Sequence, residues 1–408
     1  MILIWTYGLF IKEFFLTLVF SVLFWGRAMK YFPYFYLVLL SFFITNGVVF
    51  AHDQKMKRAS AIYTSITSKK LSRASKDYQD IVNLAQSEDW KAIAQKAVED
   101  DLFIDSTALQ FAYHLIRKEN ENDLVLDDAL GLVVGVIRDN LDARSLLTGN
   151  ELFVPSSRLG QITLSSNEAF VRLTERNLSL KKFLKKRTPQ WNLAEVNQAA
   201  GILTTRGWAQ RYYNMGTNRI AVVKLLEGFL CSDIPDWRAA GIPTFRIRRD
   251  IDRAPGGDPN EFQSKCVTCH SGMDAMAGAF SHLNYEGGRL RFLYDVASKY
   301  NQNETVFPQG YVTYDRSWIN LFYLPQHQKW GIKGNESGEG VLELGKLISE
   351  SSGFARCMSS RVVEHVCRKK VSTESKEIKR FAARFKGRKY SFKSLFVDVA
   401  AADFCFED

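Results

Sequence analysis

Cys266, Cys269 and His270 fall within the five-residue run Cys266-Val267-Thr268-Cys269-His270. The spacing CxxCH is the attachment motif of a c-type haem. On one helical turn the two thiols can each add to a haem vinyl group, and the imidazole that follows is placed beneath the iron. The motif therefore predicts one covalently attached haem c, held by Cys266 and Cys269, with His270 as the proximal iron ligand.

Two other chemistries compete for these residues. A CxxC pair followed by His offers three zinc ligands, but neither a second CxxC nor an HxxxH pair follows at the spacing of a zinc finger. The two cysteines could instead form a structural disulfide. Export of the chain, argued below, favours oxidation of spare thiols over thiolate coordination of zinc, so haem attachment is the preferred interpretation.

The sequence does not identify a sixth ligand of the iron. A second Met or His ligand would give a six-coordinate electron carrier, whereas an open position would permit ligand or peroxide chemistry. Met273 and Met276 follow His270 too closely to reach the opposite haem face, so we expect them to pack in the core. Four residues lie far enough along the chain, although an ordinary core or hydrogen-bonding role explains each better: His282, His327, Met358 and His365.

The N-terminal residues indicate export, which attachment of haem c requires. Residues 29–51 have the layout of a secretory signal peptide: a short basic start, an apolar run, and a small-x-small sequence that ends at Ala51. We expect cleavage before His52 and a periplasmic or otherwise exported location in a bacterium. Residues 1–28 are also apolar, and we interpret them as an upstream extension or, alternatively, as an extra membrane segment.

The four cysteines outside the motif are predicted to form disulfides. They are Cys231, Cys357, Cys367 and Cys405. Their even number and an oxidising compartment favour one or two bridges, although four cysteines allow three connectivities. Among the alternatives we favour a bridge from Cys357 or Cys367 to Cys405, which would tether the last helix.

The chain is basic, most of all near its C-terminus. The whole sequence carries a net charge of +10, and removal of residues 1–51 leaves 51 basic against 43 acidic residues. Between Arg356 and Lys393 there are 13 Lys or Arg residues against three Glu residues. A solvated helix face is the ordinary explanation; the alternatives are an acidic redox partner, an anionic polymer and a membrane surface. Export argues against nucleic acid as the partner.

Helical periodicity dominates the elements that must position the motif. Apolar residues recur at intervals of three and four in several stretches: 90–98, 108–115, 218–229, 341–349, 354–366 and 378–385. Residues 52–85 are more polar and are interpreted as a tether or an exposed first helix. Capping residues predict two helix starts, one from Ser165 three residues before Glu168 and one from Ser372-Thr373. The fold class is therefore predicted to be mainly α.

Long irregular loops should accompany the helices. Proline and glycine crowd residues 233–260, which predicts a loop that delivers the CxxCH motif. The expected organisation has five parts: an upstream extension (1–28), a signal peptide (29–51), a polar and helical N-terminal region (52–123), a helical domain (124–232) and a haem-bearing region with basic C-terminal helices (233–408).

Four runs, taken in order, resemble the planctomycete-type cytochrome-like proteins, a family of exported bacterial CxxCH haem proteins of largely unassigned function. The runs are AAGILTTRGWA (199–209), RIAVVKLLEGFLC ending at Cys231, CVTCHSGMDAMAGAFSHLNYEGGRLR from Cys266, and GFARCMSSRVVEHV around Cys357. The resemblance covers roughly residues 124–405. It implies haem and export, and it leaves the reaction open.

The resemblance also marks individual positions. Met273, Asp274 and Arg289 match family positions, which implies that they pack around the haem. The sequence departs from the family where Asp-Pro is replaced by Asp274-Ala275 and where residues 321–340 look expanded.

These observations predict an exported mono-haem protein that transfers electrons within a periplasmic oxidoreductase system. Two alternatives stay open: a peroxidase-like haem enzyme with an open distal site, and an extracellular polymer-binding or interaction module in which haem is structural. Whether the protein is an enzyme is not decided by the sequence. No catalytic triad or carboxylate pair can be singled out, so hydrolysis has no support.

Overall fold

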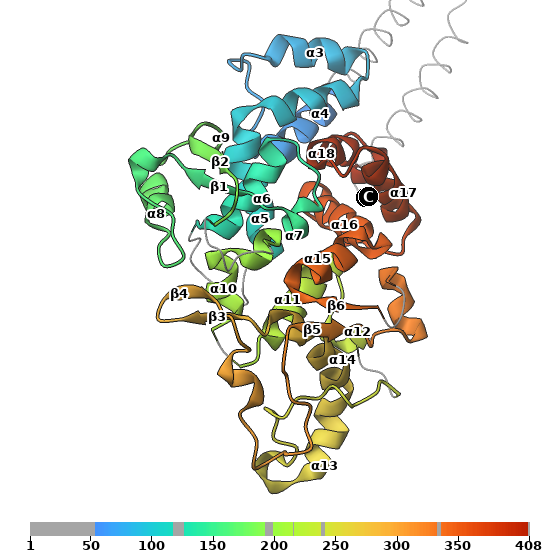
Figure 1. Cartoon of the computed structure of the whole chain (residues 1–408). Coiled ribbons are helices and arrows are strands. Elements are labelled where there is room, and N and C mark those ends of the chain that lie inside the picture. Colours follow the sequence, from blue (N-terminus) through green and yellow to red (C-terminus); the bar gives the residue numbers. More distant parts are fainter. Residues whose placement is uncertain are drawn as a thin grey trace, which may run out of the picture. The chain divides into compact units, whose positions relative to one another are not determined.

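The computed structural model describes residues 54–116, 126–191, 199–214, 216–237, 241–332 and 336–406 (Figure 1). Within them the chain forms a helix over residues 54–67, sixteen further α-helices labelled α3 to α18, and six short strands, so the mainly α prediction is confirmed. The described residues from Ala59 onward belong to one compact unit. The predicted signal peptide lies outside the described residues, and the boundaries expected near 124 and 233 stay predictions.

The first described helices carry an apolar face that the sequence interpretation missed. Residues 54–67 are helical, and Ala59, Ile62 and Ile66 on that helix are fully buried. Their spacing of three and four places them on one face, so the expected tether or exposed helix is wrong. The helices that follow are α3 (Tyr78–Gln86), α4 (Trp90–Glu99) and α5 (Leu109–Ile116).

The middle of the chain surrounds the buried helix α6 (Asp128–Arg138). Strands β1 (Leu152–Pro155) and β2 (Leu184–Arg187) form an antiparallel pair beside it. The remaining helices here are α7 (Ser145–Thr148), α8 (Glu168–Glu175) and α9 (Leu180–Phe183). The predicted capping box is wrong: α8 begins at Glu168 itself, and the hydroxyl of Ser166 accepts from its backbone N–H at 3.2 Å.

The CxxCH region follows three helices, α10 (Arg206–Tyr212), α11 (Arg219–Leu230) and α12 (Ile234–Trp237). Apart from α12, residues up to 254 are irregular where described, as predicted. The short helix α13 (Pro259–Glu261) then leads into α14 (Val267–Ala277). Two further antiparallel pairs complete this region: β3 (Leu283–Glu286) with β4 (Arg289–Phe292), and β5 (Ser317–Ile319) with β6 (Ser337–Glu339).

Four C-terminal helices pack back onto the first ones. They are α15 (Gly340–Glu350), α16 (Ser352–Cys367), α17 (Lys376–Gly387) and α18 (Phe392–Ala400). The predicted apolar stripe of α17 is buried, but its cap is Ser375, whose hydroxyl accepts from Ile378 N, and not Ser372-Thr373. Helix α18 lies against α4.

Among the described residues, no helix combines the length and the apolar character that a bilayer crossing requires.

Candidate functional site

The CxxCH motif lies across a junction of two helical geometries. Phe262–Cys266 is a π-helical turn, and α14 continues directly from it, so that Cys269 and His270 fall in the first turn of the α-helix. The helical segment begins with α13, whose N-cap is Asp258. The carboxylate of Asp258 accepts a hydrogen bond from the backbone N–H of Asn260 at 2.8 Å. Single π-turns within helices are frequent at functional sites.

Cys266 and Cys269 are unpaired thiols, each partly exposed. The other four cysteines form two disulfides, Cys231–Cys357 and Cys367–Cys405. The structure therefore bears out the disulfide prediction, including the favoured pairing of Cys367 with Cys405. It does not form a bridge within the CxxCH motif.

Cys266 borders an apolar cluster of residues that both precede and follow the motif. The cluster consists of Ile247, Ile251, Phe262 and Phe307, and both Cys266 and Val267 pack against it. The ring of Phe262 also contacts that of His270, with centroids 5.8 Å apart. One side of the motif therefore has an apolar wall, the surrounding that a flat and largely apolar cofactor needs.

His270 is oriented by a carboxylate one helical turn further on. Its Nδ1 lies 3.2 Å from Oδ1 of Asp274, which is completely buried. An ionised carboxylate can only accept a hydrogen bond, so the proton of the neutral imidazole belongs on Nδ1. Nε2 then carries the lone pair, and it has no hydrogen-bond partner among the described residues. This tautomer is the one that binds a metal through Nε2.

Asp274 is held in its ionised form by a buried ion-pair network. Arg219, the first residue of α11, donates from Nε to Oδ1 at 2.5 Å, and its other arm reaches Oδ1 of Asp250 at 2.8 Å. The backbone N–H of Arg248 donates to Oδ2 of Asp274 at 3.2 Å. Burial of Asp274 opposes ionisation, but Arg219 and His270 outweigh it, so the pKa of this carboxyl lies well below its ordinary value.

The network is balanced in charge. Burial raises the pKa of Asp250 against the opposing effect of Arg219, and burial lowers the pKa of Arg248. The guanidinium of Arg248 is fully buried; it donates to Thr313 Oγ1 at 2.9 Å and to the carbonyl of Asp274. Two carboxylates and two guanidiniums thus form one network, which contacts His270 through Asp274. The sequence had indicated only Asp274 among these four residues.

His327 lies behind the motif helix. A Cβ on Gly272 would come within 2.4 Å of the Phe322 ring, and that ring contacts His327 with centroids 5.2 Å apart. Gly272 follows His270 by two residues, which is about 200° around an α-helix. Phe322 and His327 therefore pack on the side of α14 that faces away from His270.

The other residues considered as distal ligands occupy different places. Met273 and Met276 are buried within α14, as expected of core residues, and Met358 is fully buried in α16. His365 contacts Phe111, His114 and Phe396. His282 precedes β3. The distal ligand stays unidentified.

Arg289 is not brought to His270. It is exposed on β4 and lines a separate cavity whose other members include Arg187 and Trp191. Met273 and Asp274 lie on α14 with His270, and the implied packing of all three residues around the haem stays a prediction.

Over the residues that the structure describes, no group of three or more His, Cys, Asp or Glu side chains is arranged to hold an ion.

The donor set fits a covalently attached haem. Two accessible thiols and an imidazole with a bare Nε2 lie within five residues, while the remaining cysteines are all paired. Comparison of the chain with protein-family models, with curated proteins and with solved structures finds no match. The likeness to planctomycete-type cytochrome-like proteins accordingly stays a prediction from its sequence runs.

Proposed function

We propose that this chain is an exported mono-haem c-type cytochrome-like protein that transfers electrons in a periplasmic oxidoreductase system. One observation carries the proposal: Cys266 and Cys269 stay free on the same helical turn as His270, although four other cysteines form disulfides. Thioether bonds would join the two sulfurs to the haem, and Nε2 of His270 would ligate the iron.

The residues around the motif have separate tasks in this proposal. The haem, when bound, supplies one-electron chemistry. Asp274 holds the Nδ1 proton of His270 and thereby keeps the ring in one tautomer and one orientation. Arg219 keeps Asp274 ionised, and the apolar side chains beside Cys266 exclude water from that side.

Export is supported by two features of different kinds. Both disulfides are compatible with an oxidising compartment, and residues 29–51 have the layout of a signal peptide. N-terminal sequencing of the mature protein should begin at His52. A mature protein that retains residues 29–51 would contradict the proposed signal peptide.

The partner is proposed to be an acidic redox protein that approaches α17. In the basic C-terminal block, Arg356, Arg361, Lys370 and Lys379 pair with glutamates, so part of its charge is neutralised internally. Four exposed cations of α17 have no carboxylate partner within the described residues: Lys376, Arg380, Arg384 and Lys386. Helix α17 therefore presents the charge that could steer an acidic partner.

Haem staining after a denaturing gel tests the central claim. Native protein should stain, and Cys266→Ala/Cys269→Ala should lose the stain, because no other free thiol is available. Cys231→Ala/Cys357→Ala is the matched control and should keep it. Staining that survives in the first double variant would overturn haem attachment at this motif.

A spectrum under carbon monoxide then separates carrier from enzyme. A carrier with two strong axial ligands should stay low-spin when reduced and bind carbon monoxide poorly. Rapid binding together with turnover of peroxide would reassign the protein as a haem enzyme.

A further inference from the structure

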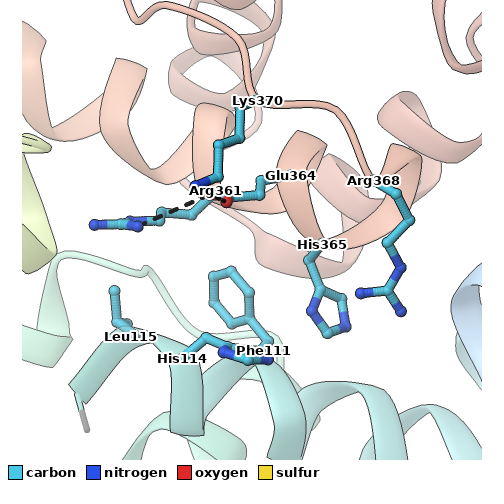
Figure 2. Close-up of a pocket in the computed structure, with 8 residues that line it drawn as sticks. All are labelled: Phe111, His114, Leu115, Arg361, Glu364, His365, Arg368 and Lys370. Carbon is cyan, nitrogen blue, oxygen red and sulfur yellow. Dashed lines mark ion pairs between the residues drawn. The ribbon is translucent and has the colours of Figure 1, made fainter. Parts of the chain in front are cut away.

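A cavity of about 350 Å³ lies between α5 and the C-terminal end of α16, far along the chain from the CxxCH motif (Figure 2). Helix α5 supplies one wall and α16 with the segment after it supplies the other. The lining residues are Phe111, His114, Leu115, Arg361, Glu364, His365, Arg368 and Lys370.

His365 is a buried polar side chain without a hydrogen bond in this cavity. It is 6 % exposed, and its ring contacts those of Phe111 and His114, each with centroids 6.1 Å apart. Neither ring nitrogen has a hydrogen-bond partner within the described part of the chain. Burial lowers the pKa of His365 to about 4, assisted by Arg368 and His114, so the ring is neutral at pH 7 and offers one N–H donor.

The cavity is also positively charged. Arg361 and Lys370 share a single carboxylate, Glu364, and each reaches it at 3.9 Å. Arg361 is fixed in place by donating to the carbonyl of Glu227 at 2.9 Å. Arg368 has no carboxylate partner in the described ranges. Three cations against one anion leave two positive charges at the opening.

The position of Arg368 is set by the fold. It follows the last residue of α16 with a left-handed backbone (φ 56°), directly after Cys367, which is bridged to Cys405. Its side chain and the ring of His365 both extend toward the α5 side of the cavity (Figure 2). Phe111 and Leu115 supply apolar surface on that side.

We propose that this cavity binds a small organic anion, a carboxylate carried on an apolar body. The carboxylate pairs with Arg368 and accepts the N–H of His365, a donor that has no partner within the described residues. The apolar body lies along Phe111 and Leu115, and a cavity of this size suits a ligand no larger than a small metabolite. The proposal is independent of haem attachment.

Isothermal titration of the full-length protein tests it with benzoate as the probe and benzamide as its uncharged match. Benzoate should bind saturably at one site, and benzamide at least tenfold more weakly. Arg368→Gln should weaken the binding of benzoate at least tenfold, because it removes the cation that pairs with the carboxylate. Arg368 is exposed, so its replacement should not disturb the core. Arg176→Gln, at the C-terminal end of α8, removes an equal charge outside the cavity and should leave the affinity unchanged.

Two variants and a second probe complete the test. His365→Phe keeps the ring contacts and removes the N–H donor, so it should weaken the binding of benzoate. Circular dichroism should show that this variant stays folded. Inorganic phosphate should bind more weakly than benzoate. Equal affinities for benzoate and benzamide, equal affinities for benzoate and phosphate, or unchanged binding in Arg368→Gln would each overturn the proposal.

Discussion

Asp274 accepts a hydrogen bond from Nδ1 of His270 at 3.2 Å, across one turn of α14. The same carboxylate oxygen accepts a hydrogen bond from Nε of Arg219 at 2.5 Å, and this ion pair keeps Asp274 ionised. The proton on Nδ1 of His270 therefore points at a negatively charged acceptor. A ligand ring that donates to a carboxylate is oriented more firmly, and donates more electron density to a metal, than one that donates to a neutral carbonyl.

Replacement of Asp274 by Asn should therefore raise the midpoint potential of the haem-bearing protein. The amide is a neutral acceptor, and the loss of about 1 kcal/mol of preference for the oxidised iron corresponds to roughly 40 mV for one electron. Potentiometric titration measures the shift. Asp250→Asn changes the same charge without touching His270, and an equal shift in both variants would show that net charge, not the hydrogen bond, sets the potential.

Arg219 should be the most costly single residue of the network to remove. Its guanidinium is 18 % exposed and contacts two buried carboxylates, and Arg219→Met would remove the cation that these carboxylates share. We expect a loss of about 3 to 5 kcal/mol in the free energy of unfolding, measured by urea denaturation. Arg249→Gln, whose partner Glu304 is 75 % exposed, should cost less than about 1 kcal/mol.

His365 should make the protein less stable in acid. Its pKa is about 4 in the folded chain and near 6.5 when unfolded, because burial, Arg368 and His114 all disfavour the charged ring. Between these values the unfolded state binds the proton and the folded state does not, so stability falls as the pH drops from 6.5 to 4, by roughly 3 kcal/mol. His365→Phe should lack this component. If the urea midpoints of the native protein and of His365→Phe fall by the same amount from pH 7 to pH 4, His365 does not contribute to the loss of stability in acid.

The two disulfides should contribute unequally to stability. Cys231–Cys357 spans 126 residues and Cys367–Cys405 spans 38. Chain-entropy arguments give about 5 and about 4 kcal/mol respectively. Paired Cys→Ala variants, compared by urea unfolding, should show the larger loss for the longer span. Peptide mapping without reductant should recover these two linkages and no others.

The free cations of α17 should govern encounters with anionic redox partners. Arg380→Gln/Arg384→Gln should slow oxidation of the reduced protein by ferricyanide at low ionic strength, because both side chains are exposed and unpaired by carboxylates within the described chain. The difference should vanish as salt is added. Lys379→Gln, whose side chain already pairs with Glu374 at 3.1 Å, should change the rate much less.

Local patterns predicted the helices well because an apolar stripe is legible in a few turns of sequence. Ile378, Phe381 and Phe385 indicated α17 correctly, and the same rule would have found the stripe of Ala59, Ile62 and Ile66, which a polar composition obscured. Helix starts were predicted less well, since several hydroxyl residues precede α17 and only Ser375 has the backbone geometry of a cap.

The candidate site was only partly visible for a physical reason. CxxCH is a local motif, and the spacing of His270 and Asp274 by four residues on one helix could have been noticed. Arg219 is 55 residues from Asp274 and reaches it only through the fold. The cavity at His365 joins helices about 250 residues apart in the chain, and no local pattern marks such a meeting.

Helix α11 has Arg219 as its first residue and ends immediately before Cys231, which is bridged to α16. One rigid rod of about 18 Å therefore joins the ion pairs beneath His270 to the disulfide at its other end. We expect movement at one end of α11 to be transmitted to the other end through the backbone hydrogen bonds of the helix. We expect α11, α14 and α16 to behave as one cooperative opening unit in native-state hydrogen exchange, and reduction of the bridge to raise exchange at the CxxCH helix as well as at its own position.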